Sequence, residues 1–147
     1  MARYKDEEVV AALQPHLEDG ERLVNFAYGV RQPNIWVIFL LMLPAILPGA
    51  IAVTLMTKEY IVGLTDRRLI ALRVKRRPPQ VKEATAYDLA SLPPSRARAL
   101  GFFTYLWIDD EAAPFRAKFH RLGMKENRRH SREMAAALTG DQAFLAT

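Results

Sequence analysis

The chain has 147 residues, half of them hydrophobic, and a formal net charge of +5. This length is enough for one domain with a core. It contains no cysteine, so disulfides, thiolate metal sites and cysteine nucleophiles are excluded. Residues 1–34 carry 4 Lys/Arg against 6 Asp/Glu, whereas residues 57–147 carry 17 Lys/Arg against 10 Asp/Glu. This basic second part predicts a polyanionic partner, either a membrane surface or a nucleic acid.

Residues 1–34 are expected to form a short helix and a first strand. The helix covers Asp6–Leu17, with Asp6 as its cap, Pro15 near its end and one apolar face formed by Val9, Val10, Leu13 and Leu17. Glu18-Asp19-Gly20 is a turn. Glu21–Arg31 follows as a strand, because apolar residues occupy positions 24, 26, 28 and 30.

The segment Ile35–Met56, IWVIFLLMLPAILPGAIAVTLM, has no charged residue. As one helix its 22 residues would extend about 33 Å, against a hydrocarbon core of about 30 Å. It begins after an acidic stretch, so we do not expect a cleaved signal peptide. A buried core helix or strand pair is the alternative. The residues expected to enter a membrane are Ile35, Trp36, Val37, Ile38, Phe39, Leu40, Leu41, Leu43, Ile46, Leu47, Ile51, Val53 and Leu55.

Two prolines leave open how this segment meets the membrane. Pro44 and Pro48-Gly49 favour a re-entrant hairpin with arms at Ile35–Leu43 and Ala50–Met56, because proline disrupts a helix interior and Pro-Gly favours a turn. A single span is the alternative, and it agrees with the positive-inside rule. We favour the hairpin.

Residues 57–140 are predicted to form the rest of a β-domain and a final helix. Glu59–Val74 is interpreted as a β-hairpin that turns at Asp66, and Lys75–Pro79 as a loop. The next predicted strands are Val81–Leu92, with Ala84, Ala86 and Leu89 inward, then Leu100–Asp109 and Pro114–Phe119. Met124–Leu138 is a predicted helix that stops at Gly140. Residues 141–147 are a tail.

The run Leu64-Thr65-Asp66-Arg67-Arg68-Leu69-Ile70, between two strands, resembles a signature of bacterial pleckstrin-homology-like (PH-like) domains. Leu17-Glu18-Asp19-Gly20-Glu21 resembles the turn that opens their first strand. The resemblance covers about Leu13–Gly140 apart from the insertion. It implies a mainly β (α+β) fold, a bent antiparallel sheet or open barrel with a C-terminal capping helix. It also implies a binding module, in some cases ring-forming. The hydrophobic insertion at residues 35–56 departs from the plain pattern.

No residue constellation points to catalysis. His16, His120 and His130 lack metal-ligand spacing, and no phosphate loop or nucleophile motif occurs. We expect no enzyme activity, no catalytic residue, no metal, no cofactor and no small-molecule substrate. Phe102, Phe103, Tyr105 and Trp107 could stack on bases, but core packing is the favoured interpretation.

The predicted function is a membrane-anchored PH-like scaffold that binds anionic lipid and a protein partner and self-assembles. Its main domain is expected on the cytoplasmic face of the cell membrane. The residues expected at lipid headgroups are Lys58, Arg67, Arg68, Lys75, Arg76 and Arg77. The alternatives are a soluble homo-oligomer packed through apolar hairpins and a basic nucleic-acid-binding domain.

Overall fold

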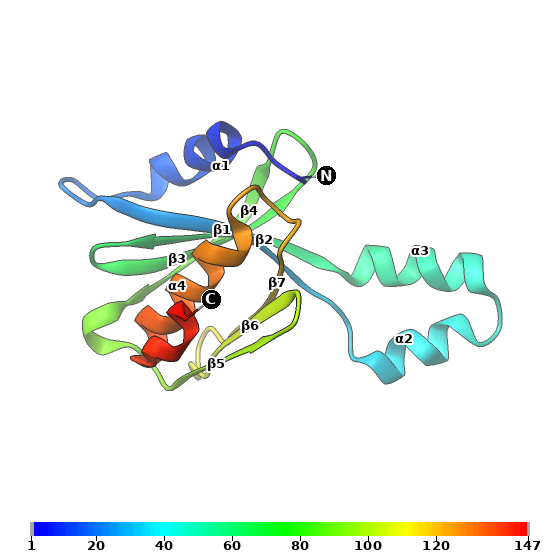
Figure 1. The fold of residues 1–147 in the computed structure, drawn as a ribbon. Helices are drawn as coiled ribbons and strands as arrows, with labels where there is room; N and C mark the ends of the chain where they lie inside the picture. Colours follow the sequence, from blue (N-terminus) through cyan, green and yellow to red (C-terminus); the bar gives the residue numbers. More distant parts are fainter. Residues whose placement is uncertain (1, 147) are drawn as a thin grey trace.

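The structure, a computed structural model, describes residues 2–146. Seven antiparallel strands form one bent sheet in the order β4-β3-β2-β1-β7-β6-β5, with a helix packed inside the bend (Figure 1). The strands are β1 (Leu23–Arg31), β2 (Lys58–Thr65), β3 (Arg68–Lys75), β4 (Gln80–Asp88), β5 (Ser95–Leu100), β6 (Phe103–Ile108) and β7 (Phe115–His120). The helices are α1 (Asp6–Leu13), α2 (Ile35–Met42), α3 (Ile46–Met56) and α4 (Asn127–Thr139), with 3-10 turns η1 (Gln14–His16), η2 (Leu89–Ser91) and η3 (Gln142–Leu145).

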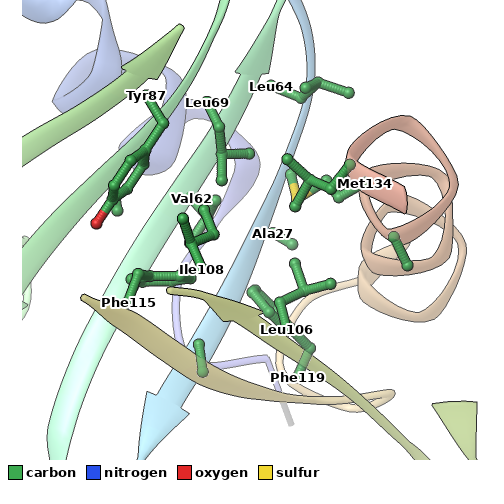
Figure 2. Packing of buried hydrophobic residues seen from close by; sticks show 14 residues of the cluster. Ala27, Val62, Leu64, Leu69, Tyr87, Leu106, Ile108, Phe115, Phe119 and Met134 are labelled. Atoms are coloured by element: carbon green, nitrogen blue, oxygen red, sulfur yellow. The ribbon is translucent and has the colours of Figure 1, made fainter. Parts of the chain in front are cut away.

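The main core lies on the concave side of the sheet, where α4 closes the bend. Figure 2 shows Met134 of α4 beside Ala27 and Leu106, which come from both halves of the sheet. Gly140 ends α4 in the left-handed conformation, at φ 73°, as the sequence predicts. A seven-stranded antiparallel sheet with a C-terminal capping helix is the PH-like architecture that the resemblance implies.

The bend leaves β1 and β7 joined by one ladder pair, Val30 with Lys118. Asn127, fully buried at the start of α4, spans this gap. Its Oδ1 accepts from the Tyr28 backbone N–H at 2.7 Å, and its Nδ2 donates to the carbonyls of Tyr28 and His120. The side chain thereby replaces sheet hydrogen bonds and fixes α4 to both halves of the sheet.

A second core lies on the other face of β1–β3, under α1. Val9 and Leu13 of α1 pack there against Ile61 and Ile70. A Cβ at Gly63 would lie 2.9 Å from the Leu13 side chain, so glycine permits this contact. The expected cap is corrected, since Lys5 is the N-cap residue and the Glu8 carboxylate accepts from its backbone N–H at 2.8 Å.

The Leu64–Ile70 signature has a structural role at the β2–β3 turn. Thr65 Oγ1 accepts from the backbone N–H of Arg68 at 2.8 Å and is 2.6 Å from Glu21 Oε1. Arg68 forms a bidentate pair with the buried Glu21, at 2.6 and 3.0 Å. The hydrogen bonds from Arg68 hold the pKa of Glu21 down at about 2. The motif therefore ties the α1–β1 turn to the β2–β3 turn.

Two strand predictions are wrong. Residues 100–109 are not one strand, because Gly101 adopts φ 56° and turns β5 back into β6. Ala84 and Ala86 are exposed rather than inward. They lie on the edge strand β4, beyond the cover of α1, while Tyr87 fills the main core. A register shift between Arg73 and Val74 alters the alternation on this strand.

The apolar block forms two short helices that extend away from the sheet as a hairpin (Figure 1). Its ends are adjacent because Arg31 pairs with Lys58 across β1 and β2. The expected turn at Pro48-Gly49 is corrected to 43–45. Pro44 lies in this turn, and Pro48 lies in the first turn of α3, where a backbone N–H has no helical partner to lose.

Candidate functional site

The hairpin α2–α3 is the most apolar exposed surface of the described chain. Of the sixteen large apolar side chains that are exposed in residues 2–146, eleven lie between Ile35 and Met56. Leu55, Ile46 and Trp36 are 81%, 75% and 74% exposed. A helix that is apolar on every side is typical of a protein interior or a membrane. Contiguous exposed surface of this kind marks an interaction site.

The residues expected to enter a membrane divide into two groups. Ten are exposed, whereas Ile38, Leu41 and Val53 are half-buried. A Cβ at Gly49 would lie 2.5 Å from the Leu41 carbonyl oxygen, so glycine permits the close approach of α2 and α3. The two helices thus pack on each other and leave their outer sides uncovered.

The threonine hydroxyls of the hairpin and the start of α2 have internal partners. Thr54 Oγ1 donates to the Ala50 carbonyl at 2.9 Å, and Thr57 Oγ1 donates to the Val53 carbonyl at 2.8 Å. Asn34 caps α2 by accepting from the Trp36 backbone N–H at 3.0 Å. Pro44 and Pro48, at and near the tip, have no N–H to satisfy. These pairings lower the cost of placing the threonines and the start of α2 in hydrocarbon, whereas the first turn of α3 has no side-chain cap.

The helices have 8 and 11 residues, or about 12 and 16 Å at 1.5 Å per residue. Among residues 2–146, no helix is both long enough and apolar enough to cross a bilayer. The turn around Pro44 separates α2 from α3, so residues 35–56 form a helical hairpin and not one continuous helix. The arms have about the depth of one leaflet, half of a ~30 Å hydrocarbon core.

Basic residues surround the base of the hairpin, in two grooves. One groove, of about 340 Å³, contains Leu55 and Met56 together with Lys58, Arg73 and Lys75. The other, of about 320 Å³, contains Ile35 and Ile38 together with Arg31, Arg116 and Lys118. Apolar and cationic side chains therefore meet at the level where the hairpin leaves the sheet.

The acidic residues nearest the base are already paired. Glu83 accepts from Arg73 at 2.7 Å. Glu59 accepts from Arg3 at 2.9 Å and from the Tyr28 hydroxyl at 2.8 Å. Burial, followed by the hydrogen bond to Glu59, raises the pKa of Tyr28. With these carboxylates engaged, Lys58, Lys75 and the exposed arginines dominate the local charge.

The six predicted headgroup residues do not lie together. Lys58 and Lys75 are exposed beside the hairpin, and Arg76 and Arg77 follow in the β3–β4 turn. Arg77 pairs with Glu8 at 3.3 Å.

Arg67 and Arg68 lie in and just after the β2–β3 turn, about 24 Å from Lys58 along eight residues of β2. The Arg68 charge is bound to Glu21. Arg67 and Arg68 therefore lie at the far end of β2 from the hairpin and are not part of the basic surface around its base.

The preferred interpretation of the β6 aromatics as core is wrong. Thr104, Leu106 and Ile108 point inward, so Phe103, Tyr105 and Trp107 lie on the outer face, and Phe102 is exposed in the turn. The alternation of β6 could have revealed this, because a strand buries every second residue. The residues 2–146 contain no cluster of three metal-ligating side chains.

No protein-family model and no curated protein sequence matches the chain. Among solved structures, it is similar to the crystal structure of a pleckstrin homology domain from Shewanella amazonensis SB2B, with 13% identity and a TM-score of 0.39 over 78% of this chain and 82% of that chain. It is also similar to the hSac2 domain from human phosphoinositide phosphatase Sac2, with 13% identity and a TM-score of 0.42 over 80% of this chain and 69% of that chain. The PH-like description of this chain rests on its strand order and capping helix.

Proposed function

We propose that the chain is a non-catalytic, PH-like binding module that attaches to a membrane through the hairpin at residues 35–56. The hairpin enters one leaflet, and the β-domain stays at the surface. The observation that carries the proposal is the exposure of eleven large apolar side chains on this one projection. Lys58, Lys75 and Arg76 then face the headgroups of anionic lipids.

The transfer energies of the apolar side chains favour insertion. Twelve Ile, Leu, Val or Phe side chains in the hairpin, at roughly −0.3 to −0.6 kcal/mol each, contribute about −4 to −7 kcal/mol. Each basic residue near an anionic leaflet adds about 1 kcal/mol. Because both ends of the hairpin meet at Arg31 and Lys58, the domain keeps β1 and β2 paired on the same side of the membrane. We propose that this side is the cytoplasmic face, because the positive-inside rule associates an excess of basic residues with that side.

The exposed remainder of the domain is proposed to recruit protein partners or further copies. A second candidate function is a homo-oligomer in which hairpins of several copies bury each other without lipid. The same exposed side chains favour it, because a helix pair that is apolar on all sides can be covered by protein as well as by acyl chains. Light scattering without detergent distinguishes this candidate, since it predicts one defined multimer.

The test is fractionation of cells that express the full chain, followed by a wash in 1 M salt. Insertion predicts that the protein stays with the membranes after the wash and is released only by detergent, because salt screens charges but does not weaken apolar burial. Recovery in the soluble fraction at low salt without detergent contradicts the proposal. Release by salt alone would reduce the attachment to electrostatics and also contradict it.

A further inference from the structure

The outer face of β5, β6 and β7 carries aromatic side chains between two rows of basic ones. Three residues from each strand point to this face, and the pairing of the strands aligns them in rows. They are Arg96, Arg98 and Leu100 on β5, Phe103, Tyr105 and Trp107 on β6, and Arg116, Lys118 and His120 on β7. These nine residues form the outer aromatic face.

The rings of this face are in contact with its cations. The Arg96 guanidinium lies 5.7 Å from the Trp107 ring centroid, and Lys118 Nζ lies 4.6 Å from that of Phe103. Tyr105 and Trp107 stack, with 11° between their planes. Each of the three rings therefore contacts a cation or another ring, and the cations lie next to the rings. Partial burial lowers the pKa of Lys118.

The outer aromatic face adjoins the hairpin. The groove of about 320 Å³ is lined by Ile35 and Ile38 of α2 on one side and by Tyr105, Arg116 and Lys118 on the other. Trp107 pairs with Arg116 near the same end of the sheet. The helix α4 packs on the opposite, inner side of β5–β7, against Leu106, so it leaves this face open.

We infer that the outer aromatic face is a second membrane contact, which lies on the headgroups of an anionic leaflet while the hairpin is inserted beside it. This inference rests on the proposed function. Trp and Tyr are the side chains enriched at membrane–water interfaces. Arg98, Arg116 and Lys118 bind lipid phosphates there. The contact fixes the orientation of the domain, with the outer face of β5–β7 toward the membrane and α4 away from it.

A single-stranded nucleic acid is the competing ligand, since bases stack on aromatic platforms between cations. Two observations favour the membrane. The cations and rings already engage each other, which leaves less ring surface for bases than an open platform offers. The face is also continuous with the apolar hairpin through the shared groove, and a nucleic acid gives no reason for an apolar neighbour.

The first test removes two charges from the face. Arg98→Gln/Arg116→Gln is compared with Lys125→Gln/Arg128→Gln, which removes two exposed charges from the α4 side. The full chain is floated with vesicles of phosphatidylcholine, with or without phosphatidylserine. We expect the first variant to bind the anionic vesicles about 25-fold more weakly, or about fivefold per cation. The control should change less than threefold, and binding to neutral vesicles should not change. Equal losses in the two variants would overturn the inference.

The second test uses the two tryptophans of the chain, Trp36 in the hairpin and Trp107 in the face. Trp107→Phe leaves Trp36 as the reporter of the hairpin, and Trp36→Phe leaves Trp107 as the reporter of the face. A phosphatidylcholine with a nitroxide on its headgroup should quench Trp107 emission on anionic vesicles.

The outcomes separate the two proposals. Quenching of Trp36 in vesicles with no effect on Trp107 would refute the face alone. A lack of quenching at both positions would refute the membrane function. Fluorescence anisotropy with a labelled single-stranded oligonucleotide completes the test. If Arg98→Gln/Arg116→Gln abolished oligonucleotide binding and left vesicle binding intact, the face would be a nucleic-acid surface and the inference would be wrong.

Discussion

Leu47→Asp places a charge near the tip of the hairpin. Leu47 is 73% exposed in the first turn of α3, so the substitution should cost the folded domain less than about 0.5 kcal/mol in water. In the proposed orientation the side chain lies deep in the hydrocarbon of one leaflet, since α3 spans about 16 Å. Loss of a leucine and gain of an aspartate there cost together about 3–4 kcal/mol. Partition into vesicles should fall by roughly 100- to 1000-fold.

The assay is flotation of the full chain with phosphatidylcholine vesicles at several lipid concentrations. Leu145→Asp is the matched control, because Leu145 is 51% exposed in η3, outside the hairpin. Equal partition of the two variants would refute the reasoning. Loss of a multimer in Leu47→Asp without any change in vesicle binding would favour hairpins that bury one another.

Three further predictions concern the fold. In Gly49→Leu the new side chain meets the Leu41 carbonyl, so proteolysis within residues 35–56 should increase, while the thermal midpoint of the β-domain stays nearly constant because the hairpin lies outside both cores. The pKa of Glu21, about 2 when folded against 4.5 ordinarily, gives stability that is fully present above pH 4.5 and lost as the pH falls toward 2. The linkage relation gives up to about 3 kcal/mol, and solvent around Arg68 reduces this to about 1–2 kcal/mol. In urea, Glu21→Gln should therefore have a lower free energy of unfolding than the wild type at pH 7, and this free energy should depend less on pH. A wild-type pH profile for this variant would contradict the pairing. Met134→Ala, at a fully buried position, should lower the free energy of unfolding by about 2–5 kcal/mol in urea, and a loss under 1 kcal/mol would contradict the packing of α4.

The β2–β3 hairpin and the end of α4 follow from local chemistry. Asp66 marks the turn, and Gly140 adopts the left-handed conformation that ends a helix. The position of the turn between α2 and α3 is harder to predict from sequence, because Pro48-Gly49 has two interpretations. In sequence it is a turn signal, but in the fold Pro48 starts a helix and Gly49 provides a helix contact. Only the packing of α2 on α3 distinguishes them.

Only part of the candidate site can be predicted from the sequence. The apolar residues are evident from composition, whereas the surrounding cations come from β1, β2, β3 and β7 and meet only through the sheet order. Arg116 and Lys118 were not assigned to the site for this reason. The charge of Arg68 looked free in sequence, but a partner 47 residues away, Glu21, binds it.

The depth of the hairpin tip in a bilayer tests the central claim most directly. The chain has no cysteine, so Ala45→Cys can carry the only spin label, and Ala2→Cys provides a label outside the hairpin. On vesicles, electron paramagnetic resonance with oxygen and a water-soluble nickel chelate should place the label at position 45 about 12–16 Å below the phosphates and the label at position 2 in water. A label at position 45 that stays as accessible to the chelate as the one at position 2 would contradict the account.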